Sequence, residues 1–145
     1  MANHGYVKSR KKMDPKRITE VLQDLNTTRF KGLLTIEHTD DMWEVSAPKY
    51  VYRRCWLETP HRFEIKHGPG GTFAWWVDFH ISNAIALAYD GTIYDDGCDI
   101  KEKGDPNYCP TLSEMYDRMQ IPHAMLEHES RLTPPEFRDQ LPQAL

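Results

Sequence analysis

The sequence FAWWVDFHISNAIALAYDGTIYDDG, residues 73–97, is the most apolar and aromatic stretch of an otherwise polar chain, and it constrains the fold most strongly. At its start, Phe73, Trp75, Val77 and Phe79 alternate with Ala, Trp, Asp and His, which is the period of a half-buried strand. Asp90-Gly91 then reads as a hairpin turn. The stretch is therefore predicted to form the central strands of a sheet.

Upstream, Asp14-Pro15 predicts a helix start, because aspartate can cap and proline suits the first helical position. Apolar residues at helical spacing follow and should form one buried stripe. Four strands are expected next, at residues 31–38, 43–47, 50–57 and 61–66, and the glycine-rich turn 67–71 should lead into the central strands. The residues predicted to form the core are Ile18, Leu22, Leu25, Leu34, Ile36, Phe63, Ile65, Trp75, Val77, Phe79, Ile85 and Leu87.

Downstream, Thr111 to Glu114 and Thr133 to Glu136 both fit the capping box that opens a helix. Short turns between the strands favour antiparallel over parallel pairing, which needs long crossovers. The sequence thus predicts an α+β fold: residues 1–13 as a basic extended arm, and residues 14–145 as a single domain with mainly an antiparallel meander sheet. One N-terminal helix should pack on a face of that sheet, and residues 111–145 should be a helical or irregular segment.

Composition sets broad limits. The chain has 145 residues, a formal net charge of −4 and 28% charged residues, which is typical of a globular domain. It has no apolar run long enough for a membrane span and no apolar segment after the basic N-terminus, so neither a membrane protein nor a signal peptide is expected. Three cysteines without framework spacing predict free thiols and a cytoplasmic location, or one inside an assembled particle. No spacing predicts a metal site or a cofactor.

The basic N-terminus is the clearest electrostatic feature, with six Lys and Arg against one aspartate in residues 1–17. Clustered cations attract phosphates or acidic protein surfaces, and a nearby tyrosine could add a stacking contact. Deleting residues 1–12 should then weaken partner binding and leave thermal stability nearly unchanged. The residues predicted to contact a partner are Tyr6, Lys8, Arg10, Lys11, Lys12, Lys16 and Arg17, together with Trp76 on an aromatic sheet face.

The candidate catalytic residues are His80, Asp78 and His128. In a strand, Asp78 and His80 would share one face, as a base and its orienting carboxylate do. His80-Ile81-Ser82 and His128-Glu129-Ser130 also resemble the paired H-x-(S/T) motifs of the 2H phosphoesterases, which imply one acidic and one basic histidine acting on a phosphodiester. That family places both motifs on core strands, whereas His128 lies here in a predicted helix or loop.

These observations favour a small non-enzymatic binding or assembly protein, such as a subunit of a viral particle or nucleoprotein assembly. It would dock through the basic arm and an aromatic sheet face. A protein partner is expected, and the basic arm could also bind nucleic acid. The protein could also form an oligomer. The alternatives are a small phosphodiester-processing enzyme that uses His80 with Asp78 or His128, and a stand-alone nucleic-acid-binding module.

Overall fold

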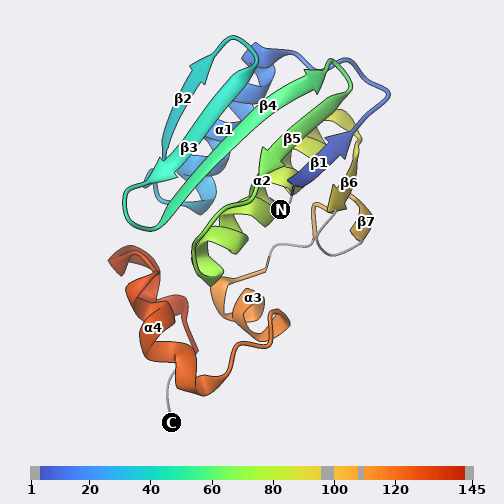
Figure 1. Ribbon diagram of the computed structural model, residues 1–145. Helices are drawn as coiled ribbons and strands as arrows, with labels where there is room; N and C mark the ends of the chain where they lie inside the picture. Colours follow the sequence, from blue (N-terminus) through green and yellow to red (C-terminus); the bar gives the residue numbers. More distant parts are fainter. Residues whose placement is uncertain (1–3, 96–99, 108–109, 143–145) are drawn as a thin grey trace.

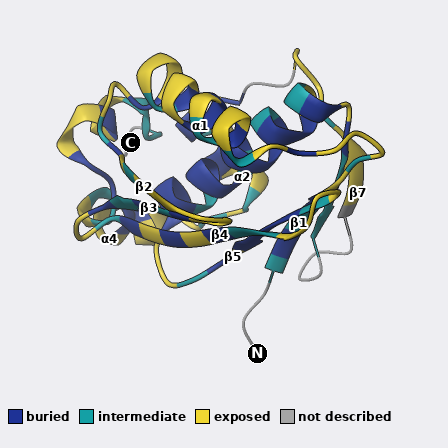
Figure 2. Cartoon of the chain, turned by 90° about the horizontal axis from the view of Figure 1, so that it is seen from above, coloured by how far each residue is buried: buried dark blue, intermediate teal, exposed yellow. Residues whose placement is uncertain are grey.

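Seven strands form one antiparallel sheet, and two long helices lie on one of its faces (Figures 1 and 2). The computed structural model describes residues 4–95, 100–107 and 110–142. The order across the sheet is β2-β3-β4-β5-β1-β6-β7, and all neighbours are antiparallel. The predicted α+β class is thereby confirmed. The strands are β1 (His4–Lys8), β2 (Thr35–Thr39), β3 (Met42–Ala47), β4 (Val51–Thr59), β5 (Arg62–Lys66), β6 (Thr92–Asp95) and β7 (Ile100–Lys103).

The four strands expected between residues 31 and 66 are present as the meander β2 to β5. Their alternation places Trp43, Val45, Cys55, Phe63 and Ile65 on one face, where each is at most 1% exposed. Cys55 is a free thiol whose pKa is raised by burial. Cys98 and Cys109 lie outside the described residues.

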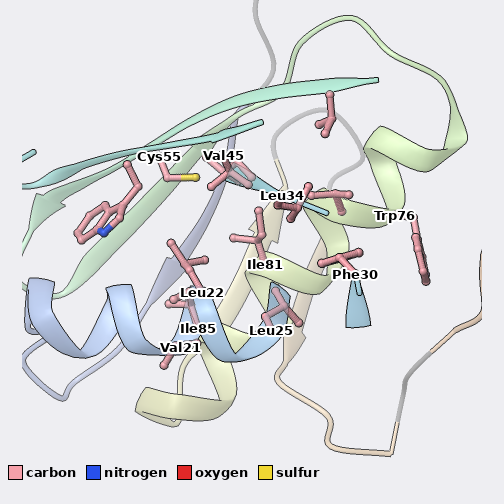
Figure 3. Close-up of a cluster of buried hydrophobic side chains, with 14 of the residues drawn as sticks. Val21, Leu22, Leu25, Phe30, Leu34, Val45, Cys55, Trp76, Ile81 and Ile85 are labelled. Carbon is pink, nitrogen blue, oxygen red and sulfur yellow. The ribbon is translucent and has the colours of Figure 1, made fainter. Parts of the chain in front are cut away.

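Helix α1 (Pro15–Arg29) begins where the sequence predicts. Asp14 caps it by accepting a hydrogen bond from the backbone N–H of Lys16, and proline occupies the first turn. Its buried stripe of Ile18, Val21, Leu22 and Leu25 faces the sheet and the second long helix (Figure 3).

The prediction for the central stretch was wrong, because residues 72–89 form helix α2 (Thr72–Tyr89) rather than strands. Thirteen of its residues are buried, so α2 has no solvent-facing polar stripe of the kind that reveals a surface helix. Asp90-Gly91 ends this helix instead of turning a hairpin. Asp90 adopts the left-handed conformation with φ 51°, and the N–H of Gly91 donates to the carbonyl of Ala86 at 2.8 Å.

Because the stretch is helical and not extended, some of its residues that were predicted to be buried are exposed or half-buried. Ile85 and Val77 are buried as expected, but Leu87 is 42% exposed, and Trp75 and Phe79 are only half-buried. Trp75 and Phe79 lie one turn apart on α2, so the same face carries both. The helical period explains these three differences, whereas Ile36, also predicted for the core, is only half-buried on the edge strand β2.

The glycine-rich turn 67–71 also leads into a helix and not into a strand. Gly71 is the N-cap of α2, and the buried carboxylate of Glu129 accepts a hydrogen bond from the N–H of Thr72 at 3.0 Å. A β-carbon on Gly71 would lie 2.3 Å from that carboxylate oxygen, so glycine is required for this approach. The first turn of α2 is therefore capped from within the chain.

The predicted N-terminal arm differs most from the structure. Residues 4–8 form β1, which lies inside the sheet between β5 and β6 (Figure 1). Val7 is 0% exposed and pairs with Phe63 on one side and Ile93 on the other. Residues 4–8 of the predicted arm are thus part of the sheet, and residues 9–14 connect them to α1.

The C-terminal region is helical, as predicted, and lies beyond one end of the sheet (Figure 1). Thr111 caps α3 (Leu112–Arg118) by accepting from the N–H of Glu114, which confirms the first capping box. It is followed by η1 (His123–Met125), α4 (Leu126–Arg131) and η2 (Pro135–Gln140). The second capping box does not form, because Pro134 is the N-cap of η2 and Thr133 donates to the carbonyl of Glu129. Of the helices in the described part of the chain, none combines the length and apolarity needed to cross a membrane.

Candidate anion-binding groove and a buried charge network

A basic groove lies where the C-terminal end of β1 meets the ends of α2, β6 and β7. It has a volume of about 730 Å³. We call it the basic groove and define it by its lining residues: Lys8, Ser9, Arg10, Lys11, Tyr89, Asp90, Thr92, Tyr94, Lys101 and Lys103. All five of its cations are exposed. Two separate chain segments supply them, the N-terminal strand with its loop and strand β7.

An aromatic stack beside the groove orders some of these cations. Tyr6 and Tyr94 are cross-strand partners, and their rings stack with centroids 5.0 Å apart and an interplanar angle of 8°. The Arg62 guanidinium lies 4.0 Å from the Tyr6 centroid, and the Lys8 ammonium lies 5.6 and 5.4 Å from the two tyrosines. Lys101 lies 5.8 Å from the Tyr94 centroid. Cation–π attraction therefore holds positive charge at the uncovered face of the sheet.

Among the described residues, the groove is lined by five cations and a single carboxylate, that of Asp90, in a chain whose formal net charge is −4. Within residues 4–95, 100–107 and 110–142, no salt bridge involves any of the five cations. Like charges held together in this way repel each other and favour an anionic ligand.

A structural role accounts for only part of this charge. In general, a cation near the C-terminal end of a helix offsets the negative end of the helix dipole. Helix α2 has no basic residue of its own in its last turn. Lys103 supplies such a contact, since its ammonium donates to the carbonyl of Asp90 at 3.5 Å. One lysine suffices for this role, so the dipole of α2 does not require the other four cations.

Four of the eight predicted partner-contact residues belong to this region: Lys8, Arg10 and Lys11 line the groove, and Tyr6 joins the aromatic stack. Lys12, Lys16 and Arg17 are exposed but do not line it, and Arg17 pairs with Glu20 at 3.5 Å.

The assignment of Trp76 to an open sheet face was wrong. It belongs to α2, is 4% exposed, and donates its indole N–H to the carbonyl of Pro110 at 2.8 Å. Its ring contacts Phe30 and Phe137 in the core. The uncovered sheet face instead carries Tyr6 and Tyr94, Tyr52, which is 52% exposed, and His4 packed edge-on against Trp56.

The three catalytic candidates do not form a pair. Two residues apart on a helix, Asp78 and His80 point to different sides of α2. Asp78 contacts Arg53 and His67, whereas the His80 ring packs edge-on against Phe30 and Trp76. Burial and the nearby charge of Arg29 lower the pKa of His80 to about 4, so it is neutral near pH 7. His128 is exposed on α4.

Asp78 instead centres a buried charge network that links β4, β6 and the turn after β5 to α2. One of its oxygens accepts from Arg53 Nε at 2.6 Å, and the other bonds His67 Nδ1 at 3.0 Å. The second ring nitrogen of His67 bonds Asp95 at 3.2 Å. Gly5 of β1 makes room for this imidazole, because a β-carbon there would lie 3.1 Å from His67 Nε2.

Burial disfavours the charged form of His67, but hydrogen bonds to Asp78 and Asp95 outweigh this and raise its pKa to about 9. Near pH 7 the network therefore contains two cations and two carboxylates. Both ring nitrogens are committed, so His67 has no lone pair for use as a base. In the described residues, no group of acidic, histidine or cysteine side chains has the geometry of a metal site.

The raised pKa of His67 predicts a specific pH dependence of stability. Protonated His67 stabilises the folded state fully below its ordinary pKa of 6.5, and this contribution disappears as pH rises through about 9. The free energy of unfolding should therefore fall by about 2–3 kcal/mol between these pH values. Urea melts across this range should show the fall in wild type and in His128→Gln, and not in His67→Gln. Parallel profiles for His67→Gln and wild type would contradict the assignment.

Sequence reasoning missed Lys101, Lys103 and His67. The two lysines lie in a charged segment without apolar periodicity, and only their pairing with β6 brings them to the groove. His67 was assigned to a flexible turn, and its two carboxylate partners come from a helix that was predicted to be a strand and from β6. Compared with models of known families, with curated proteins and with solved structures, the chain matches none of them.

Proposed function

We propose that this protein is a non-enzymatic binding protein that docks on the phosphate backbone of a nucleic acid through the basic groove. The observation that carries the proposal is the set of five exposed cations that line one groove without a salt-bridge partner among the described residues. Lys and Arg that neutralise phosphates release condensed counterions, which drives such binding without base recognition.

The character of the groove favours phosphate over a protein partner. Stable protein–protein interfaces have an apolar centre with a polar rim. Of the described residues that line the groove, the large apolar side chains are Tyr89, which is buried, and Tyr94, which is half-buried. Tyr6 lies between Arg62 and Tyr94, so its ring faces are already covered and do not serve as a platform for a base. We therefore expect contacts to the backbone with little sequence preference.

The alternative of a phosphodiester-processing enzyme has less support. It needs His80 beside Asp78 or His128, whereas His80 is buried among aromatic rings on another side of α2 from Asp78. Docking on an acidic protein surface uses the same cations and is distinguished by experiment.

The direct test is fluorescence anisotropy with a labelled single-stranded DNA longer than the ~4–16 nucleotides that one small binding fold covers. We expect binding whose logarithmic affinity falls linearly with the logarithm of salt concentration, by about 0.7 per phosphate contact. Polyglutamate should compete poorly. Failure to bind single-stranded DNA, duplex DNA or RNA at low salt would overturn the proposal, and strong preference for polyglutamate would favour the acidic protein partner.

A matched pair of variants locates the binding. Lys101→Glu with Lys103→Glu should weaken DNA binding about tenfold or more at ~0.1 M salt and reduce the salt slope, because two phosphate contacts become repulsive. Lys12→Glu with Lys16→Glu makes the same change in net charge outside the groove, and it should alter affinity less than about twofold. Equal losses in both variants would mean that net charge and not the groove determines binding.

A further inference from the structure

The sheet face opposite α1 and α2 carries aromatic and basic side chains in alternation along β4 (Figure 2). Tyr52, Arg54 and Trp56 occupy every second position of this strand and point to the uncovered face, whereas Arg53 and Cys55 between them are buried. Tyr52 is 52% exposed, and within the described part of the chain its ring has no aromatic or cationic partner. The fold therefore leaves this ring available to a ligand.

A cross-strand row connects the aromatic residues of β4 with the basic groove. Tyr6 of β1 and Trp56 of β4 both lie opposite Glu64 of β5, and Tyr94 of β6 lies opposite Tyr6. The row thus crosses three strand spacings, or ~14 Å, and ends at Tyr94 in the lining of the groove. The carboxylate of Glu64 is held by Arg62 at 2.7 Å, so it presents no unpaired charge along the row.

A hollow on the same face adjoins Trp56. It has a volume of about 310 Å³ and is lined by Thr39, Asp40, Asp41, Met42 and Trp56. This volume is at the lower end of the range for small-molecule sites. The two aspartates are exposed and would repel a phosphate. A base, and not the backbone, is therefore the part of a nucleic acid that fits beside Trp56.

Charge is distributed unevenly over this face. Arg54 lies opposite Lys66 of β5, both are exposed, and neither forms a salt bridge within the described residues. Carboxylates gather on the other half of the sheet, where Glu37 of β2 lies opposite Glu44 of β3, which is also the neighbour of Arg54. Phosphates should therefore follow the part of the face from β4 to the groove and avoid β2 and β3.

We propose that the nucleic acid is single-stranded and runs from the basic groove across this face, where bases stack on Trp56 and Tyr52 and phosphates lie beside Arg54 and Lys66. This inference rests on the proposed function. A single strand exposes both faces of its bases, whereas neighbouring bases cover those faces in a duplex, so only a single strand can use the aromatic rings. Neither contact reads the 2′-hydroxyl group, so a DNA strand is a suitable probe.

The first test compares a labelled thymidine strand of ~20 nucleotides, longer than the ~4–16 that one binding fold covers, with the same strand paired to its complement. Fluorescence anisotropy at ~0.1 M salt should show about fivefold or tighter binding of the single strand, although the duplex has the higher charge density. Equal or tighter binding of the duplex would overturn this inference and leave the proposed function standing. Absence of binding by both, persisting at low salt, would overturn the two together.

Variants of the aromatic residues locate the stacked bases. Tyr52→Leu and Trp56→Leu remove a ring and keep an apolar side chain, so each should weaken single-strand binding about fivefold or more. The salt slope and the duplex affinity should stay the same, because no phosphate contact is lost. Tyr52→Phe should restore the affinity that Tyr52→Leu loses. Lys101→Glu with Lys103→Glu should instead weaken the binding of both probes.

Circular dichroism and thermal melts establish that each variant is folded. Unchanged single-strand affinity in the two leucine variants would overturn the stacking inference, and so would an equal loss for the duplex. If Trp56→Leu does not fold, Tyr52→Leu decides the question, because its side chain is exposed.

Discussion

A protein lacking residues 1–8 is expected to lose most of its folding stability, by about 5 kcal/mol or more out of the 5–15 kcal/mol typical of a domain. The deletion removes β1 from the interior of the sheet, which leaves β5 and β6 without their shared partner. Phe63 and Ile65, both 0% exposed, would lose packing and gain water contact. Circular dichroism and urea denaturation of the purified truncation measure the loss.

Point variants within the same strand separate the core from the groove. Val7→Asp places a charge at a fully buried position and should be nearly as damaging as the deletion. Lys8→Asp, on the opposite face, should change the free energy of unfolding by less than about 1 kcal/mol. A truncated protein that melts within a few degrees of wild type would show that the sheet does not need β1. That is the result expected from the sequence alone, in which these residues resemble a detached arm.

Arg53→Met should cost about 3–5 kcal/mol, since breaking a buried ion pair leaves an uncompensated charge. The Arg53 and Asp78 side chains are 0% and 3% exposed, so water cannot replace the lost partner. Arg53 Nη1 also donates to the carbonyls of Tyr52 and Pro69, and these contacts would disappear too. Urea melts at pH 7 provide the measurement.

The neighbouring residue is the control for this prediction. Arg54→Met makes the same chemical change at an exposed position and should cost less than about 0.5 kcal/mol. In a double-mutant cycle, Arg53→Met combined with Asp78→Leu should cost less than the sum of the two single changes, because neither charge is then left alone. Additive costs would mean that the two side chains do not stabilise each other.

The elements that the sequence predicts correctly are those with local signals. Helix α1 has a cap, a proline and one apolar stripe, and β2 to β5 alternate in register with their neighbours in the chain. Helix α2 was missed because it is buried on nearly every side, and a helix that is apolar all round lacks the period that separates it from a strand.

The candidate sites depend more heavily on long-range contacts. Lys8, Arg10 and Lys11 stand out because they are clustered in the chain, whereas Lys101 and Lys103 join them only through pairing of β7 with β6 and of β6 with β1. The Arg53, His67 and Asp78 network likewise joins β4, the turn after β5, and α2. No local pattern specifies either arrangement.

The position of β1 also determines the order in which the molecule can fold. During synthesis the meander β2 to β5 can pair as it emerges, because each turn is short. Strand β1 emerges earlier but must wait for β5, and its second partner β6 appears only after the whole of α2 has been made. Until then the edge of β5 is open to pairing with another chain. Closure of the β5–β1–β6 ladder should therefore be the slow step of folding, and the time before closure is when the nascent protein is most prone to aggregate.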